Sequence, residues 1–288
     1  MKISKGKLLF IFLISLIVLV VGFPLIMSPQ PLAIHVLDVG QGDSILIITP
    51  NNKSILIDGG DEDYGEYVVD YLKRQNIKRI DWLVGTHPHS DHIGGLGTVI
   101  SHLEIGEFYM PSTPHTSIVF EDLLRNVAEK KLKITGGKAG DVIDISKDLS
   151  INLLGPLENY GDDLNNWSIV LQLKYKEKSF IFMGDAEEQV EEDLLDAYPS
   201  HQLKSHFIKI GHHGSTTSTS PKFLDALAPD VAIITVGKDN AYGHPHKSIL
   251  QRIYSYQVKL YRTDLQGSVV FYSDGQKIWS TTPPLRSK

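Results

Sequence analysis

The sequence contains no cysteine. Disulfide bonds and thiolate metal ligands are therefore excluded, so any metal ion must be held by histidine and carboxylate side chains. Positive charge is also scarce. The 288 residues carry a formal net charge of −6, and because Lys2, Lys5 and Lys7 give residues 1–27 a charge of +3, the remainder carries −9. This excludes a strongly basic nucleic-acid-binding surface, and the acidic bias is typical of an ordinary soluble surface.

Two common catalytic motifs are missing as well. A phosphate-binding P-loop needs Gly-Lys-Ser/Thr before a helix, whereas the glycine-rich stretch Asp38–Asp43 lacks the lysine and precedes a predicted strand. No Gly-x-Ser-x-Gly elbow occurs, which disfavours a serine nucleophile. We expect Asp43 and Asp58 to support a histidine-rich loop instead, by accepting backbone hydrogen bonds.

An uncharged apolar run from Leu8 to Met27 follows the three N-terminal lysines. About 20 apolar residues can cross a bilayer as a helix, whereas the core of a signal peptide usually has about 7–15. No Ala-x-Ala cleavage site follows, and the lysines favour a cytoplasmic N-terminus. We therefore expect residues 1–31 to be a membrane anchor and connector, with residues 32–288 as one domain outside the cytoplasm. The alternative is a cleaved signal, which would release a secreted protein.

From Ala33 onward, short apolar strands alternate first with turns and later with helices. Ser168–Tyr175 and Ser179–Met183 predict a hairpin, and Ala186–Ala197 predicts a charged helix. This order favours an α/β fold of two packed sheets with helices outside. Residues capable of chemistry recur where strands end in glycine-rich loops, and such loops are where sites are usually assembled. These loops are Asp38–Asp43, Asp58–Gly60, His87–Gly95, Gly184-Asp185 and Gly211–Gly214.

The densest cluster comprises His87, His89, Asp91 and His92, which fall within six consecutive residues. A compact loop leaving a strand can direct two of the imidazoles to one metal ion while Asp91 and His92 face a second. Imidazole and carboxylate ligands suit zinc, with manganese or iron as alternatives. An exposed polar turn would not explain the apolar strand that leads into the cluster or the two glycines that follow it. The pattern therefore predicts a metal site.

One loop cannot complete two metal sites, so distant ligands are needed. Asp185 follows a buried-looking strand, and its carboxylate can bridge two cations about 3.5–4 Å apart; the alternative is that it caps the following helix. His212 is expected to complete the second site, with the neighbouring His213 directed to substrate or to a supporting carboxylate. His244 can bind an anionic oxygen or protonate a leaving group, although an incidental surface histidine is nearly as good an interpretation.

These residues resemble a known family. The stretch from His87 to His92, followed by Gly94-Gly95, resembles the signature of the metallo-β-lactamase superfamily. Within it, further motifs resemble the β-lactamase-like hydrolase domain of ComEC-type competence proteins, over roughly residues 33–280. These motifs are His35–Ser44, Asp58–Gly60, Asn165–Ser168, Gly184-Asp185, Gly211–Ser215 and Tyr242–Pro245.

The resemblance implies a four-layer αββα fold with two divalent metal ions, zinc or alternatively manganese. It also marks two departures. Where the superfamily places a third histidine on the first metal, this chain offers Asn165, Asn166 and Ser168, which leaves that ion with His87, His89 and the shared carboxylate. One predicted membrane helix precedes the domain, in place of a many-helix DNA channel, so DNA uptake by this chain alone is not supported.

The implied activity is a metal-dependent phosphodiesterase, with single-stranded DNA as one candidate substrate. The metal ions would supply hydroxide near neutral pH, Asp91 would ligate the second ion and orient the nucleophile, and His244 would act as the acid. A phosphocholine-type esterase or a lactonase could use the same centre. A non-catalytic, metal-bearing surface receptor is the alternative from another class. The oligomeric state is left open.

Overall fold

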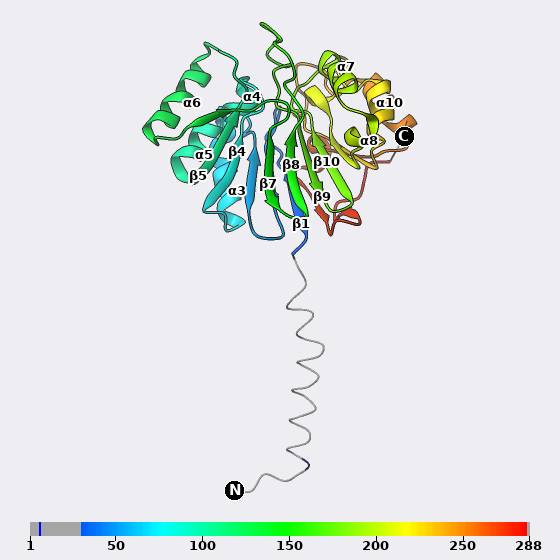
Figure 1. Cartoon of the computed structure of the whole chain (residues 1–288), viewed down its shortest axis with the longest axis horizontal. Helices are drawn as coiled ribbons and strands as arrows, with labels where there is room; N and C mark the ends of the chain where they lie inside the picture. The colour runs from blue at the N-terminus through cyan, green and yellow to red at the C-terminus, as the bar shows by residue number, and fades with distance from the viewer. Residues whose placement is uncertain (1–5, 7–29, 287–288) are drawn as a thin grey trace. The chain divides into compact units, whose positions relative to one another are not determined.

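The computed structural model describes residue 6 and residues 30–286 (Figure 1). The contacts within the chain separate residues 1–31 from a folded unit, Leu32–Lys288. The predicted membrane segment Leu8–Met27 lies outside the described residues. Among the helices that are described, none combines the length and the apolar character needed to cross a bilayer.

The first sheet has eight strands in the order β15-β14-β1-β2-β3-β4-β5-β6. Its strands pair antiparallel from β15 to β3 and parallel from β3 to β6. Parallel neighbours need a crossover, and helices supply it here: α3 (Gly65–Arg74), α5 (Leu96–His102) and α6 (Ile118–Glu129). The strands are β1 (Leu32–Val36), β2 (Ile45–Ile48), β3 (Ser54–Ile57), β4 (Arg79–Val84), β5 (Glu104–Met110), β6 (Ile134–Gly136), β14 (Val269–Ser273) and β15 (Ile278–Ser280).

The second sheet has seven strands in the order β13-β12-β11-β10-β9-β8-β7. β7 to β10 form an antiparallel meander, and β10 to β13 are parallel. The strands are β7 (Val142–Ser146), β8 (Leu149–Leu153), β9 (Leu171–Tyr175), β10 (Lys178–Phe182), β11 (Phe207–Lys209), β12 (Val231–Ile234) and β13 (Lys259–Arg262). The helices of this half are α7 (Glu188–Ala197), α8 (Ser200–Leu203), α9 (Pro221–Leu227), α10 (Lys247–Ser255) and α11 (Thr263–Gln266).

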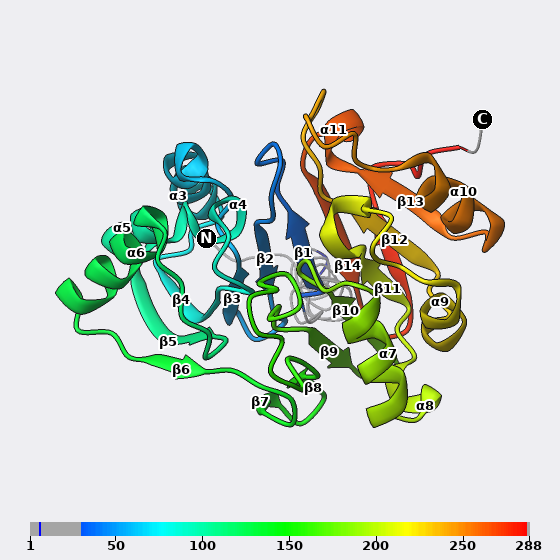
Figure 2. The same ribbon diagram turned by 90° about the horizontal axis from the view of Figure 1, so that it is seen from above.

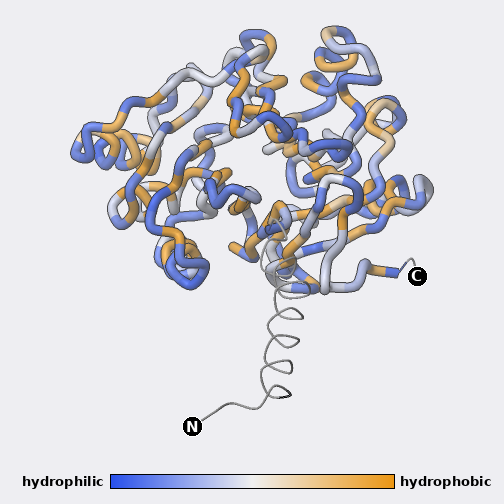
Figure 3. Tube along the Cα trace, turned by 60° about the horizontal axis from the view of Figure 1, so that its bottom comes forward, coloured by the Kyte–Doolittle hydropathy of each residue, from blue (hydrophilic) through white to orange (hydrophobic). Residues whose placement is uncertain are grey.

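Three apolar clusters hold the layers together. One lies between the two sheets, and each of the other two lies between one sheet and the helices that cover it. Successive side chains of a strand point to opposite faces, so Ile45 and Ile47 of β2 face the other sheet while Leu46 faces the helices. Figure 2 shows α3, α5 and α6 on one outer side and α7 to α10 on the other. Apolar and polar residues alternate along these helices (Figure 3), as expected when one side of a helix is buried.

The strand register brings distant loops to one edge of the two sheets. Phe182 of β10, Lys209 of β11 and Ile233 of β12 are aligned across the second sheet. In the first sheet, Ile57 of β3 is aligned with Val84 of β4. The residues that follow these strands therefore emerge side by side. The fold is thus the predicted mixed α/β arrangement of two packed sheets.

Candidate metal centre

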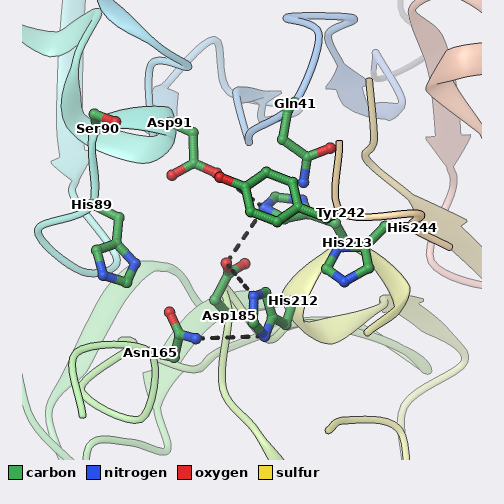
Figure 4. A pocket seen from close by; sticks show the side chains of 10 residues that line it. All are labelled: Gln41, His89, Ser90, Asp91, Asn165, Asp185, His212, His213, Tyr242 and His244. Carbon is green, nitrogen blue, oxygen red and sulfur yellow. Dashed lines mark hydrogen bonds and ion pairs between the residues drawn. The ribbon is translucent and has the colours of Figure 1, made fainter. Parts of the chain in front are cut away.

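A pocket of about 250 Å³ opens where the strand-end loops of both sheets meet (Figure 4). The loop after β4 and the helix α4 (Ser90–Ile93) bring residues from the first sheet, and the loops after β10 and β11 bring residues from the second. Neither lysine nor arginine is among the residues that line this pocket, so its walls offer an anionic substrate no permanent cation. The lining residues are Gln41, His89, Ser90, Asp91, Asn165, Asp185, His212, His213, Tyr242 and His244.

Four residues form a compact set of potential ligands: Asp91, His92, Asp185 and His213. One ligand atom from each lies within 4.8 Å of all the others. His213 Nε2 is 3.3 Å from Asp91 Oδ2 and 3.3 Å from Asp185 Oδ2. His92 Nε2 is 3.3 Å from Asp185 Oδ1. Two imidazoles and two carboxylates at this spacing match the ligand chemistry of zinc and similar divalent ions.

The hydrogen bonding of these residues fits a cation. His92 Nε2, His213 Nε2 and Asp185 Oδ1 are buried and have no hydrogen-bond partner. Buried polar atoms are normally paired, and here three unpaired atoms face one another across a few ångströms. A metal ion between them would satisfy all three, so the residues present fit the group that the sequence predicts.

The electrostatics of the free protein point the same way. Burial by itself lowers the pKa of His92 and of His213. The neighbouring carboxylates, Asp185 above all, outweigh burial, and they raise the pKa of His92 well above its ordinary value and that of His213 to about 9. Asp185 is buried too, yet the two imidazoles hold its pKa well below the usual range. Near neutral pH, protons on the imidazoles thus supply the positive charge that a metal ion would replace, and metal binding would release them.

Both candidate ligand imidazoles are oriented by hydrogen bonds to Nδ1, the ring nitrogen that faces away from the pocket. His92 Nδ1 lies 2.8 Å from Asp58 Oδ2, and Asp58 in turn accepts hydrogen bonds from the Thr86 amide and hydroxyl at 2.7 Å. His213 Nδ1 donates to the carbonyl oxygen of Thr235 at 2.8 Å. These contacts direct each Nε2 towards the pocket. Asp58 thus lies where a supporting carboxylate was predicted, and it bonds the imidazole directly as well as the backbone.

Asp43 supports the centre through a buried lysine that the sequence analysis did not single out. Lys209 Nζ donates to Asp43 Oδ2 at 2.6 Å and to the Gly184 carbonyl at 2.7 Å, and it lies 3.6 Å from Asp185 Oδ1. The Thr235 hydroxyl donates to the other oxygen of Asp43. Lys209 is fully buried, and a lysine in a short apolar strand is an anomaly that could have identified it, because lysine is rarely buried unpaired.

The predicted first metal position is less complete. His87 Nε2 and His89 Nδ1 lie 2.9 Å apart, within hydrogen-bonding distance of each other. Among the described residues, no carboxylate oxygen lies within 4.0 Å of a ring nitrogen of either histidine. Burial lowers the pKa of both, so both are neutral at pH 7. The structure therefore does not gather His87, His89 and Asp185 into one ligand group.

The residues in place of a third histidine act mainly on the protein backbone. Ser168 Oγ accepts from the Asp185 amide at 2.9 Å, and Asn166 Oδ1 accepts from the Glu187 amide at 3.0 Å. Asn165 lines the pocket, where its buried Oδ1 has no partner. The helix α7 has Glu187 as its N-terminal cap residue, so Asp185 is not the helix cap that was its alternative interpretation.

The geometry reverses the predicted roles of the two adjacent histidines. His212 Nε2 is 3.9 Å from Asp185 Oδ2, while its Nδ1 lies 2.9 Å from Glu187 Oε1. His213, predicted to point elsewhere, lies between Asp91 and Asp185 instead. Both histidines have left-handed backbone conformations, with φ of 43° and 52°. This tight turn, together with the Thr235 contact, decides which ring faces inward.

His244 lines the pocket, but it does not fit the predicted role of acid in the free protein. Burial, followed by the nearby His212 and His213, lowers the pKa of His244 to about 4. Its imidazole is therefore neutral at pH 7. In this form it can hydrogen-bond a substrate but cannot act as an imidazolium acid.

Comparison with known proteins identifies the relatives of this arrangement. The model of the metallo-beta-lactamase superfamily matches residues 37–238. ComE operon protein 3 of Bacillus subtilis (strain 168) is 32% identical over 269 residues, which are 87% of this chain and 34% of that protein. Competence protein ComA of Neisseria gonorrhoeae is 32% identical over 240 residues, 83% of this chain and 32% of that protein. The chain thus spans about a third of the length of these relatives, and they confirm the predicted resemblance.

A solved structure shares the fold. CmlA, a diiron β-hydroxylase from Streptomyces venezuelae, superposes with a TM-score of 0.55 at 14% sequence identity, over 85% of this chain and 55% of that chain. At this identity the likeness concerns the fold alone.

Replacing His213 tests the ligand assignment. We expect His213→Ala to weaken Zn²⁺ or Mn²⁺ binding by more than about 100-fold, since supporting partners of ligands alone are worth about 10–100-fold. His212→Ala is the matched control and should weaken binding by less than about 10-fold. Equilibrium dialysis of the two variants, with circular dichroism to verify folding, measures this. An equal or larger loss of metal affinity in His212→Ala would favour His212 as the ligand, as the sequence predicts.

Replacing Lys209 tests the buried ion pair. Lys209→Met leaves Asp43 buried without its cation, so we expect the free energy of unfolding to fall by about 3–5 kcal/mol. Lys259→Met, on an exposed position of β13, should change it by no more than about 0.5 kcal/mol. Urea denaturation of the metal-free proteins gives both values. A loss below about 1 kcal/mol for Lys209→Met would contradict the pairing.

Proposed function

The chain belongs to the metallo-β-lactamase superfamily of metal-dependent hydrolases, and from this premise we propose that it hydrolyses phosphodiesters outside the cytoplasm, anchored to the membrane by its N-terminal segment. The observation that carries the catalytic part is the set of three unpaired, buried ligand atoms that face one another beneath the pocket. The anchoring part is supported by the lysine-flanked apolar run Leu8–Met27.

The four clustered residues would hold a divalent ion, with zinc as the first candidate and manganese as the alternative. When bound, such an ion polarises a phosphoryl oxygen and lowers the pKa of water. His89 lines the same pocket, and the His87 ring lies beside the His92 ring with centroids 4.2 Å apart, so these two histidines would be the candidates to hold a second ion. Because the pocket walls contain no lysine or arginine, an anionic substrate depends on metal charge for its binding.

The chain's own residues would position the substrate. Glu187 holds His212 through Nδ1, and Thr217 and Asn165 also donate to Glu187 Oε1, at 2.9 and 3.3 Å. This leaves His212 Nε2 on the pocket side, where it can hydrogen-bond a substrate oxygen. Asp91 is the more accessible of the two clustered carboxylates, and it is placed to orient the attacking water. Asn165 offers an unpaired amide oxygen on the same wall.

A phosphodiester is favoured over other esters by the relatives, and the charge of the chain restricts the size of the substrate. The curated relatives include one named as a competence protein and one named as a recombination protein, which directs attention to nucleic-acid chemistry. Residues 28–288 carry −9, however, so a long polyanion finds no general attraction. We therefore favour small phosphodiesters and the ends of single-stranded DNA as substrates, over the interior of a duplex.

The test is metal-dependent hydrolysis of bis-p-nitrophenyl phosphate by the full-length chain in detergent. We expect turnover with Zn²⁺ or Mn²⁺, its loss on chelation, and its return when metal is restored. Asp91→Ala should lower kcat/KM by more than about 100-fold, whereas Asp225→Ala, on the exposed side of α9, should leave it within about two-fold of the original value.

Two outcomes would contradict this proposal. Cleavage of phosphocholine esters or lactones without cleavage of phosphodiesters would indicate a different hydrolase. Tight metal binding with no turnover of any of these substrates would indicate a metal-bearing receptor.

A further inference from the structure

Tyr242 is an unexplained feature of the pocket. Its side chain is 68% exposed, and of the large apolar side chains found exposed among the described residues, it alone lines the pocket. The other aromatic rings of the domain lie mostly in the three apolar clusters. An exposed ring beside a candidate active site is a feature of binding surfaces, since folding alone gives no reason for its position.

The exposed ring is held in place. It stacks on the His244 ring, with centroids 5.7 Å apart and planes inclined by 26°. The Asn240 side chain bridges the loop by donating to the carbonyls of Gly237 and His244, at 2.9 and 2.7 Å, and by accepting from the His244 amide at 3.0 Å. Ordering the loop before a ligand arrives reduces the entropy cost of binding.

The same loop is tied to the metal centre. The His246 amide donates to the carbonyl oxygen of Gly214 at 3.0 Å, and Gly214 follows His213 directly. The His244 ring also lies 5.4 Å from the His212 ring. Figure 4 shows the Tyr242 ring across the middle of the view, with His89, Ser90 and Asp91 on the left and His244 on the right. The ring therefore keeps a fixed place relative to the clustered ligands.

The size of the pocket indicates what the ring contacts. Its volume of about 250 Å³ is below the range of about 300–1,000 Å³ that is usual for small-molecule sites. A phosphodiester group fits within it, but a group attached to the phosphate must extend over the rim. One face of the Tyr242 ring lies on His244, and its high exposure leaves the other face open at that rim.

We propose that Tyr242 is the stacking platform for a nucleobase joined to the scissile phosphodiester, which makes the substrate a nucleotide ester. Every base has a flat π-face, so an aromatic platform binds nucleotides without sequence preference. The inference rests on the proposed phosphodiesterase function and narrows its substrate class. It also explains how a domain of net negative charge can bind a nucleotide, because stacking requires no basic surface.

The lining of the pocket argues against a choline headgroup as the occupant of the rim. Quaternary ammonium groups are recognised by cages of several aromatic rings. Tyr242 is the one Phe, Tyr or Trp among the residues that line this pocket. A single open ring face suits a planar base better than it suits a cation that must be surrounded.

Two substrates with the same leaving group provide the test. Thymidine 5′-(p-nitrophenyl phosphate) carries a base, and methyl p-nitrophenyl phosphate does not. The preference for the thymidine ester is the ratio of its kcat/KM to that of the methyl ester, measured with the metal-loaded full-length chain. We expect Tyr242→Ala to lower this ratio by about 10-fold. Tyr242→Phe keeps the ring and should keep the preference. Leu265→Ala removes an exposed side chain outside the pocket and serves as the control.

A binding measurement accompanies the kinetics. The inhibition constant of thymidine 5′-monophosphate should rise about 10-fold in Tyr242→Ala. The inhibition constant of inorganic phosphate, which has no base, should stay unchanged in this variant. Competition by linear oligothymidylate with the same Tyr242 dependence would identify strand ends as the source of the nucleotide. Competition by mononucleotides alone would identify free nucleotide esters, and both results support the platform.

Failure of this inference can be told apart from failure of the proposed function. Hydrolysis of both esters with an unchanged ratio in Tyr242→Ala would overturn the stacking platform and leave the phosphodiesterase in place. Absence of turnover of either ester in the wild-type chain, with every divalent metal tried, would overturn both.

Discussion

The structure depends on holding several buried carboxylates at one edge of two sheets. Asp43, Asp58, Asp91 and Asp185 all lie around the same centre, and three of them are almost fully inaccessible to solvent. Such charges repel one another and are costly to bury unless each is paired. The chain supplies part of the compensation through Lys209 and through the protons on His92 and His213. His92 Nε2, His213 Nε2 and Asp185 Oδ1 still lack a hydrogen-bond partner and lie together, so a bound cation would complete the site.

The scaffold makes this concentration of charge feasible. The carboxylates and imidazoles follow strands whose register is fixed by apolar contacts on both faces. Hydrogen bonds with Thr86, Ser168 and Thr235 then set the direction of individual groups. Thr86 and Thr235 lie just after β4 and β12, and Ser168 lies shortly before β9, so the rigid sheets hold the partners of the ligands in place. The candidate functional residues therefore lie in short loops that these contacts hold rigid.

Much of this could be predicted from the sequence, because the relevant signals are local. The dense run from His87 to His92 indicated a metal site, and alternating strands and helices indicated two sheets with outer helices. The helix predicted from Ala186 begins at Glu188, and the strand predicted from Ser168 begins at Leu171. In each case one of the extra residues makes a polar contact with a residue of the pocket, Glu187 with His212 and Ser168 with Asp185, which the local pattern does not reveal.

The differences between prediction and structure arise where tertiary contacts, which the local sequence does not show, decide the outcome. The chain order of His212 and His213 gives no sign that the second of them turns inward, because that follows from a left-handed backbone and from the Thr235 carbonyl, just beyond the neighbouring strand β12. The buried pairing of Lys209 with Asp43 joins residues from different sheets. Likewise, His244 is a candidate acid by residue type, whereas burial and then the neighbouring histidines lower its pKa to about 4 and keep it neutral at pH 7.

The four clustered ligands come in equal numbers from the two halves of the sandwich, with Asp91 and His92 beyond β4 and Asp185 and His213 beyond β10 and β11. An ion held by all four is therefore a cross-link between the sheets as well as a reagent. Its binding free energy adds to the cohesion of the whole domain. Metal supply would then govern how long the protein stays folded, in addition to how fast it works.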